Sequence, residues 1–279
     1  MIQILHLSDP HFGAADQKVA DNFISRAAEL SPDLTLLSGD LTMRARRREM
    51  ADARSFVNDL PTPHLLIPGN HDIPALNQPL DRFFRPFRRY QETFGEELEP
   101  ELLEGRVHVV GLNSNRPFGF HRDWSEGRIK ASSLARAEKR FHQGSSELKI
   151  LMLHHPLIAP EEYGREVVKP LPDLLKLIDR QRIDLVLCGH FHRSHLAILA
   201  ASKSWSCVVS QAATVCSTRL QGEPQGFHEL HFSTDQIDIV RHRYEVESFI
   251  EAEKFTYFRG ANGWQVANLE THDESKRIP

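Results

Sequence analysis

The sequence contains few cysteines and no long apolar segment. Only 3 cysteines occur in 279 residues, and their odd number without CxxC spacing argues against a disulfide framework and for a reducing compartment. No apolar run approaches the ~20 residues of a membrane-spanning helix. The first residues have neither the basic segment nor the cleavage site of a secretion signal. We therefore expect a globular, cytoplasmic protein without a transmembrane segment.

The chain also lacks a strong net charge. Its 34 Lys and Arg residues against 38 Asp and Glu residues give −4 at pH 7, so nothing attracts it globally to nucleic acid, and no nucleic-acid partner is expected. Peripheral contact with a membrane and homo-oligomerisation both stay open. Histidine, in contrast, is abundant, with 16 residues. The positions of these histidines decide which of them carry chemistry.

Short apolar runs alternate with helical patterns through the first two thirds of the chain. The runs are rich in Leu, Ile and Val and show little alternation, which is typical of strands covered on both faces. Strands alternating with helices predict βαβ units and a mostly parallel sheet. The runs span residues 2–7, 34–37, 65–67, 107–112, 150–153 and 185–187.

The pattern changes after residue 204. Residues 204–209, 226–232 and 236–244 alternate apolar with polar side chains between turns, which predicts antiparallel strands. The sequence has no internal repeat, low-complexity tract or evident linker. We therefore expect a single domain over residues 1–265, followed by a flexible tail over residues 266–279.

Polar side chains follow five of the apolar runs at the point where each run ends. In open α/β sheets, ligands bind beyond the carboxyl ends of the strands, and parallel neighbours bring those ends to one edge. Glycines at 39, 69 and 189 allow the backbone to turn sharply there. The polar residues are Asp9, His11, Asp40, Asn70, His71, Asp72, His154, His155, His190 and His192.

This mixture of carboxylate, amide and imidazole groups predicts a metal site. It suits borderline divalent cations such as Mn, Fe or Zn, and it lacks the thiolates of a closed structural zinc site. The ligands are too many for one ion, so two ions that share a bridging carboxylate fit better. Residues two apart in extended backbone point the same way, so Asp9 with His11, and His190 with His192, can each converge on one location.

These motifs resemble those of the calcineurin-like metallophosphoesterases. The sequence has D-x-H, G-D, G-N-H-D, H-x-P and G-H-x-H in the order of that family, over about residues 1–195. The resemblance implies an α/β fold, a four-layer αββα sandwich. Two mixed central β-sheets would be flanked by helices, with the metal site at the carboxyl edge of the strands.

The resemblance also implies a role for each motif residue. Asp9, His11 and His192 would hold one divalent ion. Asn70, His154 and His190 would hold the other, and Asp40 would bridge the two. His71 is similar to the family's catalytic histidine, and Asp72 would orient the segment around it. Mn or Fe are the expected ions, with Zn as an alternative.

The implied activity is hydrolysis of a small phosphodiester or nucleotide substrate by in-line attack of metal-bound hydroxide. The motif wording is most similar to that of the bacterial class III cyclic nucleotide phosphodiesterases, which points to a 3',5'-cyclic nucleotide. A nucleotide-lipid pyrophosphatase or a DNA nuclease on the same site are alternatives. The former usually has arginine where His71 stands, and the latter is usually longer. A non-catalytic scaffold ranks last, because every ligand is retained.

Other segments leave two or more interpretations open. A loop over residues 113–124 is either a substrate-recognition loop or an ordinary packed loop. The arginines at 44, 46, 47 and 48 either capture anions or form a solvated face. The stretch 82–90 is a lid, a dimer contact, a membrane-surface patch or a partly buried helix broken at Pro86. His6 and His228 are expected to be structural, with His228 facing solvent. The candidate substrate-binding residues are Asn115, Arg116, His121, Arg122, Trp124 and His155.

Overall fold

The computed structural model describes residues 1–75, 78–117, 126–144, 146–159 and 167–267. Strands alternate with helices as far as α6, and only strands follow it. In chain order the elements are β1 (Ile2–Leu7), α1 (Gln17–Leu30), β2 (Leu34–Leu37), α2 (Arg47–Asn58), β3 (His64–Leu66), η1 (Asn70–Asp72), α3 (Pro79–Phe84), α4 (Arg88–Phe94), β4 (Glu101–Glu104), β5 (Val107–Leu112), α5 (Ala131–Gln143), β6 (Leu148–Leu153), α6 (Leu171–Gln181), β7 (Leu185–Cys188), β8 (His195–Ala200), β9 (Ser206–Gln211), β10 (Gly226–Ser233), β11 (Gln236–Glu245), β12 (Ser248–Gly260) and β13 (Gly263–Val266).

The strands form two halves of one hydrogen-bonded sheet. In the first half β3, β2 and β1 are parallel, and β10, β11 and β12 continue antiparallel from β1. In the second half β5, β6, β7 and β9 are parallel, with β4 and β8 antiparallel to β5 and β9. β13 joins the halves. It pairs along its length with β12, and it meets β9 only at Gly263 and Ser206 among the described residues.

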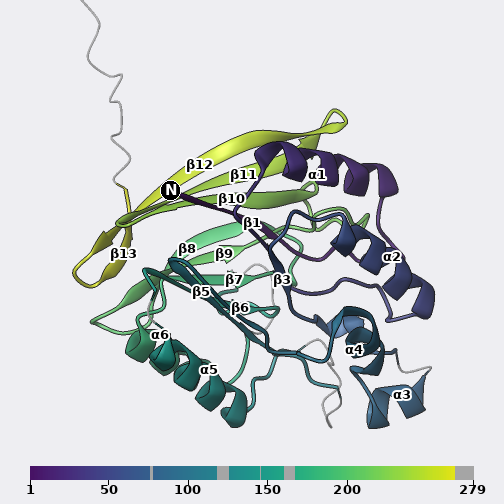
Figure 1. Ribbon diagram of the computed structural model, residues 1–279, viewed down its shortest axis with the longest axis horizontal. Coiled ribbons are helices and arrows are strands. Elements are labelled where there is room, and N and C mark those ends of the chain that lie inside the picture. The colour runs from purple at the N-terminus through teal and green to yellow at the C-terminus, as the bar shows by residue number, and fades with distance from the viewer. Residues whose placement is uncertain (76–77, 118–125, 145, 160–166, 268–279) are drawn as a thin grey trace, which may run out of the picture.

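The two halves pack face to face between two layers of helices. Alternate residues of β1 show this arrangement: Ile4 belongs to the core shared with Val109 and Leu151 of the second half, whereas Leu5 packs with Phe23 of α1. In Figure 1, α1 and α2 lie on one outer side of the molecule, and α5 and α6 lie on the other. The predicted α/β sandwich with helices on both outer faces is confirmed.

The prediction for residues 204–209 is right in part. β9 pairs antiparallel with β8, a strand that the sequence pattern did not reveal, but it also pairs in parallel with β7. Ser210, the residue after the predicted run, is fully buried between the two halves of the sheet, where it contacts His6 and His228. The carboxyl end of β9 therefore reaches the same edge as that of β7.

The two arginine-rich segments, residues 82–90 and 44–48, lie in and before helices. α3 and α4 are separate helices on either side of Pro86, as expected for a helix broken by proline. Arg82 is buried and donates to the carbonyl of Pro74 at 2.7 Å. The arginines at 44, 46, 47 and 48 are exposed, as the interpretation of a solvated face expects.

In the described ranges, no helix combines the length and the apolar character that crossing a membrane would require. β13 extends to Val266, so the first residue of the predicted tail belongs to a strand. Residues 268–279 of that tail lie outside the described residues.

Candidate metal centre and substrate site

The five predicted strand ends meet at one edge of the molecule. Asp9 and His11 follow β1, Asp40 follows β2, and Asn70 and His71 lie in η1 after β3. The remaining histidines follow β6 and β7. Several of these residues adopt left-handed backbone conformations, which cost about 1–3 kcal/mol each and cluster at functional sites. The residues with positive φ are Asp9 (54°), His11 (51°), Asp40 (52°), His190 (76°) and His192 (54°).

The first group consists of Asp9, His11 and His192. The Nδ1 atoms of both histidines face backbone carbonyls, that of Thr42 at 3.3 Å for His11 and that of Arg219 at 2.7 Å for His192. Both Nε2 atoms then face each other across 2.8 Å. Oδ1 of Asp9 lies 3.6 Å from His11 Nε2 and 3.3 Å from His192 Nε2. These three side chains therefore direct their lone pairs to one point.

The second group consists of Asn70, His154 and His190. Oδ1 of Asn70 lies 3.1 Å from Nε2 of His154 and 3.1 Å from Nδ1 of His190. The two imidazole nitrogens are themselves 3.3 Å apart. The Nδ1 atom of His154 is held by the carbonyl of Ser38 at 2.9 Å, which directs Nε2 toward the group.

Asp40 lies between the two groups. Its Oδ2 is 3.5 Å from Nε2 of His11 and 3.3 Å from Nε2 of His154, whereas its Oδ1 accepts the backbone N–H of His71 at 2.7 Å. One carboxylate oxygen thus faces a histidine of each group. This is the position that a bridging ligand requires.

The electrostatics of the groups favour a cation. Burial alone would raise the pKa of Asp9 and of Asp40, but the surrounding histidines hold both below the usual range. Burial also opposes protonation of His154, yet the Asp40 and Asp9 carboxylates raise its pKa to about 9. For His11, burial dominates and lowers the pKa to about 4. The carboxylates therefore draw positive charge to the cluster, and in the metal-free protein a proton on His154 supplies it.

The donor set fits a divalent metal. Oδ1 of Asp9 is buried without a hydrogen-bond partner in the described part of the chain, as is Nδ2 of Asn70. An unpaired buried carboxylate oxygen is costly unless a cation satisfies it. Histidine, aspartate and asparagine suit Mn, Fe or Zn. Cys188, at the end of β7, is fully buried and burial raises the pKa of its thiol, so it offers no thiolate.

Two glycines make this convergence geometrically accessible. A Cβ atom on Gly69 would collide with the Oδ1 and backbone nitrogen of Asp40. A Cβ atom on Gly189 would collide with Ser8 and with the carboxylate of Asp9. Both positions therefore require glycine because a ligand occupies the space that a side chain would fill.

His71 lies beside the first group, partly exposed. Its ring meets the ring of His11 edge-on with centroids 4.8 Å apart, and its Nδ1 donates to the carbonyl of Met43 at 2.7 Å. Nε2 faces the guanidinium of Arg219, with Nη1 at 3.4 Å. The sequence predicted His71 as a catalytic residue, and the structure brings it next to the metal groups.

Asp72 holds the loop and does not face the edge of the site. It is fully buried, and it accepts from the backbone N–H groups of Leu41 (3.1 Å), Gly69 (2.8 Å) and Thr42 (2.8 Å) and from the Thr42 hydroxyl (2.9 Å). Burial and the Asp40 carboxylate raise its pKa to about 7 against these donors. Its geometry is that of a positioning residue that ties the Asp40 loop to the Asn70 loop.

The predicted substrate residues are only partly described. His155 is buried, and its Nδ1 lies 2.8 Å from the hydroxyl of Ser114. One of its ring nitrogens lies within 4.8 Å of a ring nitrogen of His154 and of His190, so it adjoins the second group. Asn115 is buried and donates to the carbonyl of Pro68 at 2.7 Å, and Arg116 is partly exposed. His121, Arg122 and Trp124 lie outside the described residues.

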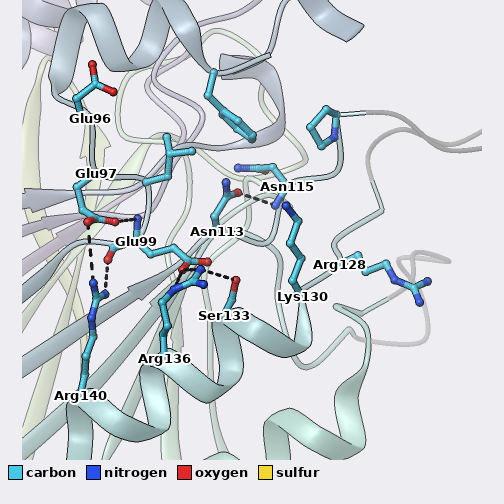
Figure 2. A pocket seen from close by; sticks show the side chains of 13 residues that line it. Glu96, Glu97, Glu99, Asn113, Asn115, Arg128, Lys130, Ser133, Arg136 and Arg140 are labelled. Carbon is cyan, nitrogen blue, oxygen red and sulfur yellow. Dashed lines mark hydrogen bonds and ion pairs between the residues drawn. The ribbon is translucent and has the colours of Figure 1, made fainter. Parts of the chain in front are cut away.

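A cavity of about 480 Å³ adjoins the segment after β5. Figure 2 shows Asn113 and Asn115 at its wall, with Lys130 and Ser133 from the start of α5 beneath them. Ser114, between the two asparagines, instead contacts His155. The segment 113–115 thus separates this cavity from the histidine cluster.

Sequence reasoning missed a buried polar chain under the site. We expected His228 to face solvent, which is wrong, because its side chain is 1% exposed. Ser210 Oγ lies 3.0 Å from Nδ1 of His6 and 2.7 Å from Nδ1 of His228. The other ring nitrogens lie 3.0 Å from Ser38 Oγ and 2.6 Å from Ser194 Oγ. This series of buried polar side chains connects the loop that carries Asp40 with the loop that carries His192.

Arg219 was also missed. It lies in the segment after β9, which runs beside the first motif: Thr214 bridges to Ser8, and its hydroxyl donates to the carbonyl of Asp9 at 2.6 Å. The signal that could have revealed Arg219 is the sixth strand end on this edge, because Arg219 lies in the segment that follows it.

With this geometry established, the chain can be assigned by comparison. It belongs to the calcineurin-like phosphoesterase family, whose sequence model matches residues 2–194. The match contains both groups and Asp40, and it ends before Arg219. The resemblance inferred from the motifs is confirmed.

Curated relatives are named as phosphodiesterases. A probable cyclic nucleotide phosphodiesterase of Synechococcus sp. is 31% identical over 172 residues, which cover 60% of this chain and 60% of that protein. A probable glycerophosphodiester phosphodiesterase of Arcobacter nitrofigilis is 24% identical over 233 residues, with 78% of this chain and 80% of that protein covered. A 3',5'-cyclic-nucleotide phosphodiesterase of Nostoc sp. is 23% identical over 206 residues, with 69% and 72% covered.

Solved structures share the fold at low identity. PhoD superimposes with a TM-score of 0.70 at 10% identity, covering 95% of this chain and 71% of that one. A purple acid phosphatase from yellow lupin (Lupinus luteus) gives 0.66 at 13% identity, covering 91% and 53%. These likenesses establish the architecture alone.

Proposed function

We propose that this protein is a phosphodiesterase that uses two divalent cations, Mn or Fe, with Zn as an alternative. Asp9, His11 and His192 hold one ion, and Asn70, His154 and His190 hold the other. The observation that carries the proposal is the position of Asp40. Its Oδ2 lies 3.5 Å and 3.3 Å from histidines of the two groups, as a ligand common to both ions would. When bound, two such ions lower the pKa of water and offset the negative charge of a phosphate.

The protein side chains then orient the substrate and move protons. His71 is anchored through Nδ1 to Met43, so its Nε2 is the nitrogen available to hold a proton for the departing oxygen of the ester. Asp72 fixes this geometry, because it ties the backbone on both sides of His71 to the Asp40 loop. His155, Asn115 and Arg116, with His121, Arg122 and Trp124, are proposed to contact the substrate.

We propose a small phosphodiester as the substrate class. The relatives named above support it, since their names place them with 3',5'-cyclic nucleotides or glycerophosphodiesters. The wording of the motifs favours a cyclic nucleotide among these two.

The test is hydrolysis of bis-p-nitrophenyl phosphate and p-nitrophenyl phosphate by purified, metal-analysed protein with manganese. His71→Ala is assayed beside His142→Ala, which removes an exposed histidine of α5. We expect two metals per chain, preference for the diester, and a kcat reduced by roughly 10²–10⁴-fold only in His71→Ala. A preference for the monoester, or a chain that binds no metal, would contradict the proposal. Cyclic nucleotides and glycerophosphodiesters are then compared as substrates.

A further inference from the structure

Arg219 places its guanidinium group beside His71, next to the first metal group. Its side chain is partly exposed, and its Nη1 lies 3.4 Å from Nε2 of His71 and 3.5 Å from Sδ of Met43. Neither contact supplies a negative charge to a guanidinium that is charged at every physiological pH. Within the described part of the chain, no carboxylate forms an ion pair with Arg219.

The backbone of Arg219 is fixed. Thr218 donates its N–H and its hydroxyl to the carbonyl of Ala14, both at 2.9 Å, and the N–H of Arg219 donates to the hydroxyl of Ser217 at 3.1 Å. The carbonyl of Arg219 accepts Nδ1–H of His192 at 2.7 Å. A single residue thus orients a metal-group histidine through its backbone and presents a cation through its side chain.

A guanidinium without a carboxylate partner among the described residues, next to the two proposed metal groups, can bind an anion. Divalent ions on Asp9 and Asp40 would compensate those carboxylates and leave the charge of Arg219 without a counterpart. Two other arginines are engaged elsewhere. Arg89 is paired with Asp81 at 2.7 Å, and Arg193 donates to the carbonyl of Gln221.

We propose that Arg219 binds a non-bridging oxygen of the substrate phosphate and is a substrate-binding residue of this site. The inference rests on the proposed function and adds a residue outside the range of the family match. Guanidinium groups bind phosphate oxygens through short, charge-assisted hydrogen bonds.

The experiment compares Arg219→Met and Arg219→Lys with Arg47→Met, which removes an exposed arginine from α2. Metal content and unfolding temperature are measured first. Then calorimetry with inorganic phosphate gives the Kd of the manganese-loaded proteins, and assays with bis-p-nitrophenyl phosphate give KM and kcat. We expect Arg219→Met to weaken phosphate binding and raise KM by about 10- to 100-fold. Arg219→Lys should be intermediate, and Arg47→Met unchanged.

Two outcomes would overturn the inference. One is an unchanged Kd for phosphate in Arg219→Met with full metal content. The other is loss of metal in both Arg219 variants, which would make the residue a support of His192 alone. If the wild type binds phosphate through Arg219 but hydrolyses neither ester, the proposed function fails and the inference stands.

Discussion

His11 and His192 approach each other through ring nitrogens 2.8 Å apart, although each ring directs its other nitrogen to a backbone carbonyl. Two neutral imidazoles held this way would place lone pair against lone pair, and although burial alone would lower the pKa of His192, the Asp9 carboxylate raises it. The unpaired oxygen of Asp9 lies within 3.6 Å of both nitrogens. The protein therefore builds a cation position before any cation arrives, with the carbonyls of Thr42 and Arg219 setting the tautomers.

Replacing Asp40 should remove metal from both groups. Asp40→Asn takes away the charge of the oxygen that faces His11 and His154, so we expect less than two metals per chain and a loss of activity above about 100-fold. Metal analysis by mass spectrometry and diesterase assays check this result. Asp52→Asn, an exposed carboxylate of α2, is the control. Full metal content in Asp40→Asn would contradict the bridging assignment.

Metal binding should release protons. The pKa of His154 is raised to about 9, so at pH 7 the metal-free protein holds a proton there that a metal must displace. Apparent manganese affinity should therefore rise between pH 6 and pH 8. Calorimetric titrations at one pH, in buffers with different ionisation enthalpies, count the protons released. Binding enthalpies that do not depend on the buffer would disprove the assignment.

Stability should depend on pH through His6. Burial lowers its pKa to about 3, below the ~6.5 of an unfolded histidine, so the unfolded chain binds the extra proton. The contribution of His6 is complete above pH 6.5 and is lost as pH falls from there toward 3. We expect the stability difference between wild type and His6→Gln to shrink by about 1–2 kcal/mol between pH 7 and pH 5. Urea unfolding in EDTA measures it, with His142→Gln as control, and a constant difference would count against the buried neutral state.

Gly69 should not tolerate a methyl group. Gly69→Ala would force Cβ into Asp40, so we expect a loss of about 1–3 kcal/mol in unfolding free energy together with reduced metal content. The control is Gly260→Ala, where the nearest atom is the flexible Nε2 of Gln265 at 3.3 Å. Equal unfolding curves for the two variants would show that the Asp40 loop can shift.

The sequence predicted the structure best at positions where a buried strand ends and a polar ligand residue follows. Leu7 to Asp9 and Leu37 to Asp40 pass from buried strand to carboxylate, so both the strand and its ligand could be predicted. Ser210 shows where this fails. A serine can be buried when its hydroxyl has hydrogen-bond partners, which here are His6 and His228. These partners are distant in the sequence, so no local pattern predicts them. The break between α3 and α4 was predicted correctly because Pro86 acts locally.

The narrow connection through β13 has a mechanical consequence for the whole molecule. The two halves of the sheet share one paired position between β13 and β9, yet each metal group draws side chains from both halves. Asp9 and His11 come from one half and His192 from the other, as Asn70 comes from one and His154 from the other. Bound ions would therefore add cross-links between two layers that already share a core and the bridge between Ser8 and Thr214. Removal of the ions should make the unfolding of the two halves less cooperative.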